Sequence, residues 1–354
     1  MVSFSGPFLW ETLQTCPEPI WLYGMGNGAE KLLQQCRERG IKVTGVFASD
    51  GFVRGQTFMG YTVKTLSQAE EISPDLTVLL AFGSSLPEVM ERIDAISRRH
   101  PLYAPDLPLF GGEVWDRGYY EAHRAELEAA YQLLGDDQSR LVFDNLVRYR
   151  LSGDLSYLAA CETPREEIYR LLDIGEEDYF DLGAYDGDTV REVMAFTGNR
   201  LRSVTAVEPD PKNAAKLLRR MPQFSSDPSF TLVQAAVWRE SGRMRFDAAA
   251  GRSASLAENG KSEVGCLTID EIVGKGKCTF LKMDVEGAEE AALLGAKNLL
   301  KAQRPKLLFS AYHRSGDLFA LPELLHQIEP SYRLYLRHQP YYPAWEVNFC
   351  ARAD

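Results

Sequence analysis

The sequence predicts an α/β protein in which two units built on parallel sheets are joined by a helical connector. Short apolar runs alternate with helix-periodic segments near both ends of the chain, whereas strand signals disappear between them. The 354 residues are enough for two domains of ordinary size. We therefore expect a Rossmann-like domain at residues 1–115, a helical connector at residues 116–175 and a second, doubly wound α/β domain at residues 176–354.

The first domain shows the element order of a small parallel βαβ fold. Its expected strands and helices are Ile20–Tyr23, Glu30–Arg39, Lys42–Phe47, Thr77–Phe82 and Pro87–Arg98. The run PLYAPDLPLFGG at residues 101–112 is rich in Pro and Gly and marks a boundary. Helical periodicity then continues through Tyr119–Leu134, Gln138–Leu151 and Leu155–Cys161. These segments form the expected connector.

Alternation of strands and helices resumes after residue 178. The expected strands are Tyr179–Leu182, Val204–Val207, Thr231–Val233, Thr279–Met283 and Lys306–Ser310, with helices at Thr189–Phe196, Pro211–Arg220 and Ala288–Leu300. The last two strand-like runs, Tyr332–Arg337 and Trp345–Cys350, are separated by HQPYYPA alone. This gap is too short for a crossover helix, so the two runs must pair antiparallel. We expect a mostly parallel sheet that ends in an antiparallel hairpin.

The composition excludes several classes of protein. The formal charge of −11 is spread along the chain, which argues against nucleic acid as the main partner. No apolar stretch approaches the length of a membrane helix, and the N-terminus lacks the pattern of a secretion signal. The six cysteines are scattered without metal-ligand spacing, as in a reducing cytoplasm, so we expect a cytoplasmic protein with no metal site. The oligomeric state stays open.

The strand ends of the second domain predict a nucleoside site. The first strand runs into the glycine-containing turn DLGAYDGDT, at residues 181–189, and the second strand ends at Glu208, about 25 residues after Gly183. An acid at this position can accept both ribose hydroxyls. Three acids, Asp181, Asp186 and Asp188, crowd the turn; their charge opposes a diphosphate and favours a cationic nucleoside, S-adenosylmethionine. The alternative is that Asp186 or Asp188 only caps the following helix.

Several motifs in the right order resemble the FkbM-type S-adenosylmethionine-dependent methyltransferases. They are DLGAYDGDT, AVEPDP, KMDVEGAEEAALLGA and PKLLFSAYH followed by LPELL. The resemblance covers roughly residues 179–352 and implies the class I methyltransferase fold, with a seven-stranded sheet and methyl transfer usually to an oxygen. It also implies the residues at the cofactor site: Asp181, Gly183, Ala184, Tyr185, Asp186 and Gly187 near the methionine part, Glu208 and Pro209 near the ribose, and Gln234 and Ala235 near the adenine.

Two residues are candidates for the base that removes the acceptor proton. Asp284 ends the fourth strand and His313 follows the fifth, so both should lie over the cleft, and a His of ordinary pKa suits proton transfer near neutral pH. The alternatives are that Asp284 caps a helix and that His313 is a loop residue without a role. His338 is a third candidate, although a solvated strand-end histidine would look the same. The small-residue run GRSASL, at residues 251–256, could close over the cleft or be an ordinary connection.

The N-terminal domain leaves more alternatives open. Gly24, Gly26 and Ala29 follow a strand in the G-x-G-x-x-A spacing of dinucleotide sites, and Asp50 lies just beyond the second strand. The domain also looks like the nucleotide-binding halves of sugar-modifying enzymes, which favours a carbohydrate-like or other small-molecule acceptor by analogy. The rival functions are an NAD(P)-linked sugar-nucleotide oxidoreductase or epimerase and a non-catalytic binding protein. A scaffold role for this domain is the simplest alternative.

Overall fold

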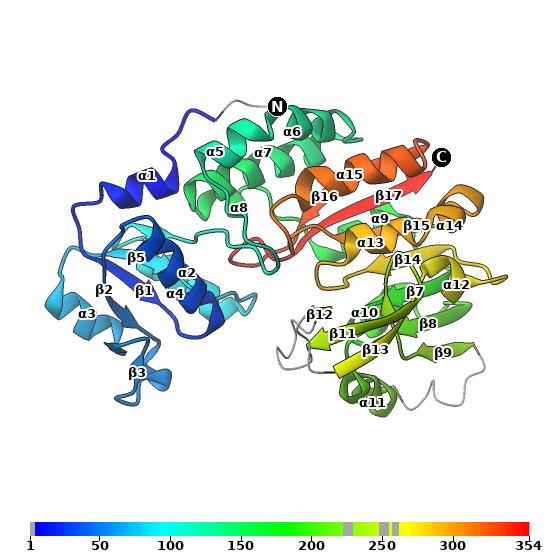
Figure 1. Ribbon diagram of the computed structural model, residues 1–354, viewed down its shortest axis with the longest axis horizontal. Helices are drawn as coiled ribbons and strands as arrows, with labels where there is room; N and C mark the ends of the chain where they lie inside the picture. The colour runs from blue at the N-terminus through cyan, green and yellow to red at the C-terminus, as the bar shows by residue number, and fades with distance from the viewer. Residues whose placement is uncertain (1–3, 222–228, 248–254, 257–261, 354) are drawn as a thin grey trace.

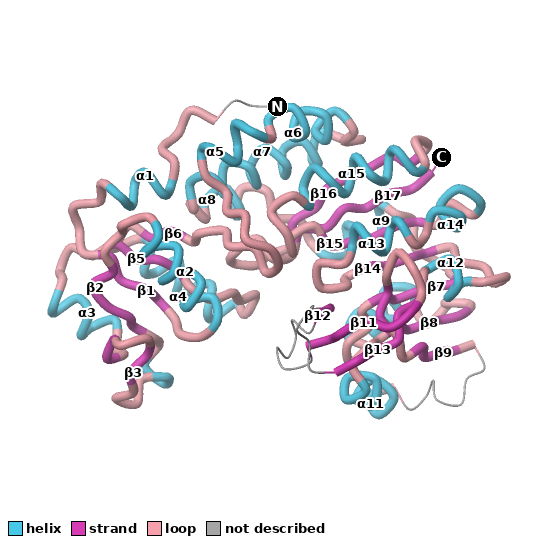
Figure 2. The backbone as a smooth tube through the Cα atoms, in the orientation of Figure 1, coloured by secondary structure: helices cyan, strands magenta, loops and turns pink. Residues whose placement is uncertain are grey.

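The computed structural model describes residues 4–221, 229–247, 255–256 and 262–353. Figure 1 shows two sheet-containing units at opposite sides of the view, with helices α5 to α8 of the connector running above and between them. The tube in Figure 2 shows the same arrangement, with strands gathered in the two units. The expected α/β class, with mostly parallel sheets, is confirmed.

The N-terminal unit holds a parallel sheet in the order β2-β1-β5-β6. Its strands are β1 (Ile20–Tyr23), β2 (Val43–Phe47), β5 (Thr77–Leu80) and β6 (Leu102–Tyr103), and a small hairpin joins β3 (Thr57–Phe58) to β4 (Tyr61–Thr62). Its helices are α1 (Leu9–Gln14), α2 (Asn27–Glu38), α3 (Leu66–Ile72) and α4 (Pro87–Ser97), with a 3-10 turn at Asp50–Phe52. The central strands β1 and β5 are buried along their whole length, as continuous apolar runs predict for a sheet covered on both faces.

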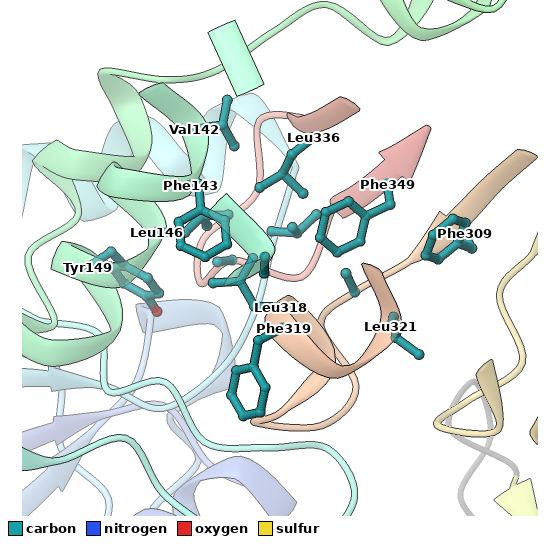
Figure 3. Close-up of a cluster of buried hydrophobic side chains, with 14 of the residues drawn as sticks. Val142, Phe143, Leu146, Tyr149, Phe309, Leu318, Phe319, Leu321, Leu336 and Phe349 are labelled. Carbon is teal, nitrogen blue, oxygen red and sulfur yellow. The ribbon is translucent and has the colours of Figure 1, made fainter. Parts of the chain in front are cut away.

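The connector is helical, as expected, and packs against the edge of the second sheet. Its helices are α5 (Arg117–Ala122), α6 (Arg124–Gln132), α7 (Asp137–Ser152), α8 (Ser156–Ala159) and α9 (Arg165–Leu171). Figure 3 shows Phe143 and Leu146 of α7 beside Leu336 and Phe349 of the final strands. The hydroxyl of Ser139 accepts the backbone N–H of Leu336 at 2.9 Å, so the helix is also held by hydrogen bonding.

Within the described residues, seven strands form the second sheet, in the order β16-β17-β15-β14-β7-β8-β9. They are β7 (Asp178–Leu182), β8 (Ser203–Val207), β9 (Phe230–Val233), β14 (Phe280–Met283), β15 (Lys306–Ser310), β16 (Tyr332–His338) and β17 (Val347–Ala353). β17 runs antiparallel to both of its neighbours and the remaining pairs are parallel, so the expected antiparallel hairpin is confirmed.

The helices that pack with this sheet show three departures from the expected pattern: one expected helix is divided, and neither α12 nor α15 was expected. The helices are α10 (Asp188–Thr197), α11 (Pro211–Arg220), α12 (Ile269–Val273), α13 (Glu289–Leu294), α14 (Lys297–Ala302) and α15 (Asp317–Ile328). The single helix expected at Ala288–Leu300 is therefore wrong. It breaks at Gly295, where a Cβ would lie 2.4 Å from the carbonyl oxygen of Trp238. Helix α15 was not expected; Pro322 stands inside it. No helix of the described segments has both the length and the apolarity needed to cross a bilayer.

A second small sheet lies between β9 and β14 in the sequence and was not expected. It has the order β10-β13-β11-β12, formed by β10 (Ala236–Val237), β11 (Gly242–Asp247), β12 (Ser255–Leu256) and β13 (Ser262–Leu267). The run GRSASL, proposed above as a possible cover of the cleft, lies outside the described residues except for Ser255 and Leu256.

Candidate functional site

A pocket of about 320 Å³ opens at the carboxyl ends of β7, β8, β14 and β15. This is the edge at which open parallel sheets bind ligands. Seven of the twelve residues expected at the site line it: Gly183, Tyr185, Glu208, Pro209, Ala235, Asp284 and His313. Residues that are up to 130 positions apart in the sequence thus meet around one cavity because their strands are neighbours in the sheet.

The other five expected residues do not line the pocket: Asp181, Ala184, Asp186, Gly187 and Gln234. Asp181 is fully buried and forms an ion pair with Lys282 at 2.9 Å. Asp186 is paired with Arg220, and Gln234 is exposed outside the lining. Two of the three acids that were expected to repel a diphosphate are therefore neutralised within the protein. Asp188 is the one of the three that lines the pocket.

The turn after β7 brings two backbone segments into unusually close contact. Gly183 has φ +77°, and a Cβ there would lie 1.8 Å from the carbonyl oxygen of Asp284. Only glycine fits such an approach. Lys282 Nζ donates to the Gly183 carbonyl oxygen at 3.0 Å. The first turn residue and the end of β14 are thus locked together at the floor of the pocket.

Glu208 joins this turn to the end of β8. One of its carboxylate oxygens accepts the backbone N–H of Tyr185 at 2.9 Å, and the other accepts that of Asp210 at 2.9 Å. The side chain is 5% exposed. Burial raises the pKa of Glu208 to about 7, even though the two N–H donors favour its charged form. The carboxylate is therefore held rigidly at the pocket wall and titrates near neutral pH.

Three carboxylates surround one imidazole at the ends of β14 and β15. His313 Nδ1 lies 3.0 Å from Glu289, and its Nε2 lies 3.4 Å from Asp284 and 3.6 Å from Glu286. Glu289 and His313 are each 1% exposed, whereas Asp284 is about one-third exposed to the pocket. The hydroxyl of Tyr312 lies 3.3 Å from both oxygens of Asp284. We call Asp284, Glu286, Glu289 and His313 the acid–histidine cluster.

The charge states of this cluster overturn one expectation. Burial by itself would lower the pKa of His313, but Glu289, Asp284 and Glu286 outweigh it and raise this pKa to about 10. Burial together with Asp284 and Glu289 raises the pKa of Glu286 to about 8. Burial opposes ionisation of Asp284, yet Lys282 and His313 hold its pKa below the usual value. The histidine is therefore cationic at neutral pH, and the interpretation of His313 as a base of ordinary pKa is wrong.

The third candidate base, His338, is also differently placed from the expectation. It is fully buried rather than solvated, and burial lowers its pKa to about 4. It does not line the pocket.

A second group of residues that line the pocket, which we call the acceptor wall, was missed in the sequence. It is formed by Arg165, Tyr312, Tyr341, Trp345 and Glu346. The rings of Tyr341 and Trp345 lie 5.8 Å apart, and Arg165 Nη1 forms an ion pair with Glu346 at 2.8 Å. The dense aromatic run in the β16–β17 connection was the available signal. No sequence signal pointed to Arg165, because this residue belongs to the connector.

The N-terminal unit and the linker after it contribute to the same site. Leu109 lines the pocket, and the backbone N–H of Phe110 donates to the carbonyl oxygen of His313 at 3.0 Å. Ser84 exchanges two backbone hydrogen bonds with Tyr342, and Gly83 stands where a Cβ would clash with the ring of Trp345. The loop that follows β5 therefore supports the aromatic wall.

The proposed dinucleotide turn of the N-terminal unit is present as a backbone feature. Gly24 and Gly26 have φ values of +117° and +114°, and α2 begins directly after them. The ring of Phe82 lies where a side chain at Gly24 would stand. Asp50 is exposed at the start of the 3-10 turn.

Comparison with known proteins finds a family match within the second unit. Residues 181–337 match the methyltransferase FkbM domain family. None of the curated proteins matches the chain in sequence. The crystal structure of a methyltransferase FkbM from Methylobacillus flagellatus KT is similar over 94% of this chain and 90% of its own, with 22% identity and a TM-score of 0.73. The fold of both units is therefore shared with that protein.

Other methyltransferase structures align with only part of the chain. A precorrin-6y C5,15-methyltransferase from Geobacter metallireducens GS-15 covers 54% of this chain and 87% of its own, at 13% identity and a TM-score of 0.34. An rRNA methylase from Streptococcus thermophilus covers 54% and 97%, at 12% identity and a TM-score of 0.36. Most of the residues that line the pocket at the strand ends lie within residues 181–337, the segment that matches the methyltransferase FkbM domain family.

Proposed function

We propose that the protein transfers a methyl group from S-adenosylmethionine to a hydroxyl group of a carbohydrate-like acceptor. The observation that carries the proposal is the composition of one pocket. The glycine turn and Glu208 line the same pocket as an aromatic and charged surface. Asp284 contacts both, through its backbone at Gly183 and through its carboxylate 3.3 Å from the hydroxyl of Tyr312. Such a pocket has a place for each of two reactants and a carboxylate at their meeting point.

The first wall fits a nucleoside. Each carboxylate oxygen of Glu208 accepts one backbone N–H, which leaves a lone pair on each for a ribose hydroxyl. Asp188 keeps its carboxylate at the pocket beside the turn and would attract a cationic ligand. When bound, S-adenosylmethionine supplies a methyl group on a positively charged sulfur, and the sulfur keeps the electron pair when the methyl group leaves. The residues present therefore fit this cofactor.

The second wall fits a sugar. Flat aromatic faces such as those of Trp345 and Tyr341 pack against the C–H faces of sugar rings, while charged groups bind the hydroxyls. The ion pair of Arg165 and Glu346 supplies both donors and acceptors at the same wall. An acceptor that is apolar throughout would cover this charged pair without offering it any polar contact.

Asp284 is the side chain that we assign to the acceptor proton. As the acceptor oxygen bonds to the methyl carbon, it must release its proton, and the carboxylate of Asp284, which is about one-third exposed and has a lowered pKa, can take it. The cationic His313 cannot accept a proton at neutral pH. Its place 3.4 Å from the carboxylate makes it a positioning residue for Asp284.

We also propose that residues 1–115 form a distinct domain that shapes the acceptor side of the pocket. Its own apolar cluster includes Leu22, Leu33 and Leu79. Its loop after β5 supports Trp345, and Leu109 of the linker lines the cavity. This role requires no nucleotide at the Gly24 turn.

Calorimetric titration with S-adenosylhomocysteine and with NAD⁺ tests the cofactor. Wild type should bind the first ligand and not the second. Glu208→Gln should weaken binding about tenfold or more, because it removes the charge from two hydrogen bonds. Glu240→Gln, at an exposed glutamate outside the pocket lining, is the control and should bind as wild type does. Equal affinity of Glu208→Gln and wild type would contradict the proposal. Transfer of a labelled methyl group to glycosides, compared with apolar alcohols, then tests the acceptor class.

A further inference from the structure

The acid–histidine cluster places three carboxyl groups around one imidazole. Asp284, Glu286 and Glu289 all lie within 3.6 Å of the ring of His313. Lys282, which favours the charged form of Asp284, is itself paired with the buried Asp181. Glu289 and His313 are each 1% exposed, and ionisable groups buried to this degree are normally paired or bound to a metal ion.

One buried polar atom in the cluster, Glu289 Oε2, lacks a hydrogen-bond partner among the described residues, and its side chain is 1% exposed. The other oxygen of Glu289 lies 3.0 Å from His313 Nδ1 and accepts the backbone N–H of Val285 at 2.9 Å. Buried polar atoms are nearly always satisfied in native proteins, so an unpartnered carboxylate oxygen beside two further carboxyl groups indicates a missing cation.

The spacing of the donors also suits a cation. One ligand atom from each of Asp284, Glu289 and His313 lies within 4.8 Å of the others. Donors bound at roughly 2.1 Å to one ion stand about 3.0 to 4.2 Å apart. Small rotations of the two carboxylates are therefore enough to bring all three donors to one ion.

We propose that Asp284, Glu289 and His313 bind a divalent first-row transition-metal ion at the edge of the pocket, with His313 releasing one proton to solvent and binding as a neutral imidazole. One imidazole nitrogen with carboxylate oxygens suits Mn²⁺, Fe²⁺ or Zn²⁺. Asp284 and His313 both line the cavity, so the ion faces it and can take an acceptor oxygen as a further ligand. The inference rests on this cluster alone and does not depend on which cofactor binds beside Glu208.

Mn²⁺ is the probe of choice because it binds thiols weakly, and the chain has six unpaired cysteines. The full-length protein is freed of metal with a chelator and titrated with Mn²⁺, and the electron paramagnetic resonance signal reports free ion. Wild type should bind one equivalent. Glu289→Gln and Asp284→Asn should bind at least tenfold more weakly. Glu289→Gln keeps an oxygen for the N–H of Val285, so it is expected to fold.

Glu290→Gln is the matched control, because Glu290 is exposed and lies next to Glu289 in the sequence. It should bind Mn²⁺ as wild type does. Absence of Mn²⁺ binding by wild type at millimolar concentration would overturn the proposal, as would equal affinity of Glu289→Gln and Glu290→Gln. Circular dichroism of each variant confirms that it is folded. Titration of the same metal-free protein with S-adenosylhomocysteine separates failure of the metal site from failure of the cofactor site.

Discussion

The backbone N–H of Phe110 donates a 3.0 Å hydrogen bond to the carbonyl oxygen of His313, and thereby ties the linker after the first domain to the acid–histidine cluster. The linker is also anchored just before this contact. Lys31 of α2 donates to the carbonyl oxygens of Pro108 and Leu109, and Asp106 pairs with the buried Arg150 of α7. The segment that the sequence marks as a boundary is thus also part of the site.

This arrangement predicts the outcome of limited proteolysis. The first cut should fall at Gly111–Glu113, the exposed tip of the linker. The two fragments should stay together in gel filtration, because two contacts join a residue before the cut to a residue after it. They are the Asp106–Arg150 ion pair and the hydrogen bond from Trp10 Nε1 to the Trp115 carbonyl oxygen. Separate elution of two folded fragments would show that these contacts do not hold the domains together.

Replacement of Gly183 by alanine should destabilise the fold far more than the same replacement at Gly198. Both glycines have positive φ values, but only Gly183 has other atoms close to the position of the new Cβ. Gly183→Ala places a Cβ 1.8 Å from the backbone oxygen of Asp284, so the turn must move. Gly198→Ala, at φ +62° with nothing within 4 Å, adds only the left-handed strain of about 1 to 2 kcal/mol. We expect Gly183→Ala to lose at least twice as much unfolding free energy in urea titration, and to lose measurable binding of S-adenosylhomocysteine. Similar losses in both variants would argue against the close approach.

The buried pair of Asp181 and Lys282 should behave as a unit. Lys282→Met leaves the carboxylate of Asp181 buried without its cation, which costs about 3 to 5 kcal/mol of unfolding free energy. The double variant Asp181→Asn with Lys282→Met removes the orphaned charge and should recover most of this loss. Urea denaturation of the three proteins measures both effects. A double variant no more stable than Lys282→Met would show that the pair is not coupled.

Cofactor affinity should depend on pH through Glu208. Its pKa is raised to about 7, so the carboxylate is charged above that pH and increasingly protonated below it. Ribose hydroxyls donate more strongly to the charged form. Binding of S-adenosylhomocysteine should therefore weaken as the pH falls from 8 to 5.5, by up to about tenfold per pH unit. Calorimetry over this range should give a flat profile in Glu208→Gln.

Asp284→Asn should lower kcat by roughly 10² to 10⁴, because it removes the proton acceptor, while the affinity for the cofactor changes by no more than a few-fold. His313→Gln should also lower kcat, because His313 positions Asp284. The double variant should then be little worse than Asp284→Asn alone. Steady-state turnover with a labelled methyl donor measures all three. Turnover of Asp284→Asn near that of wild type would remove Asp284 from the proton-transfer role.

The parts of the fold that were predictable are those in which local pattern and tertiary position agree. The strands Ile20–Tyr23 and Lys306–Ser310 were located to the residue by their apolar runs. The break at Gly295 was not predictable, because it depends on the backbone at Trp238, more than 50 residues away in the sequence. Contacts of this kind leave no periodic signal in the chain.

Part of the candidate site could likewise be predicted from the sequence, and part could not. Strand ends located Glu208, Asp284 and His313 at the pocket, since a parallel sheet brings its carboxyl ends together. The charge state of His313 could not be predicted, because it depends on Glu286 and Glu289 folding back over the ring. The acceptor wall could not be predicted for a similar reason, because Arg165 belongs to the connector and lines the pocket only in the folded protein.

The central claim is that the pocket at the strand ends binds S-adenosylmethionine. A crystal structure with S-adenosylhomocysteine tests it most directly. The account predicts electron density for the ligand in the pocket lined by Gly183 and Tyr185, with the ribose hydroxyls within hydrogen-bonding distance of Glu208. Density at the Gly24 turn of the first domain, with the pocket at Glu208 empty, would contradict it.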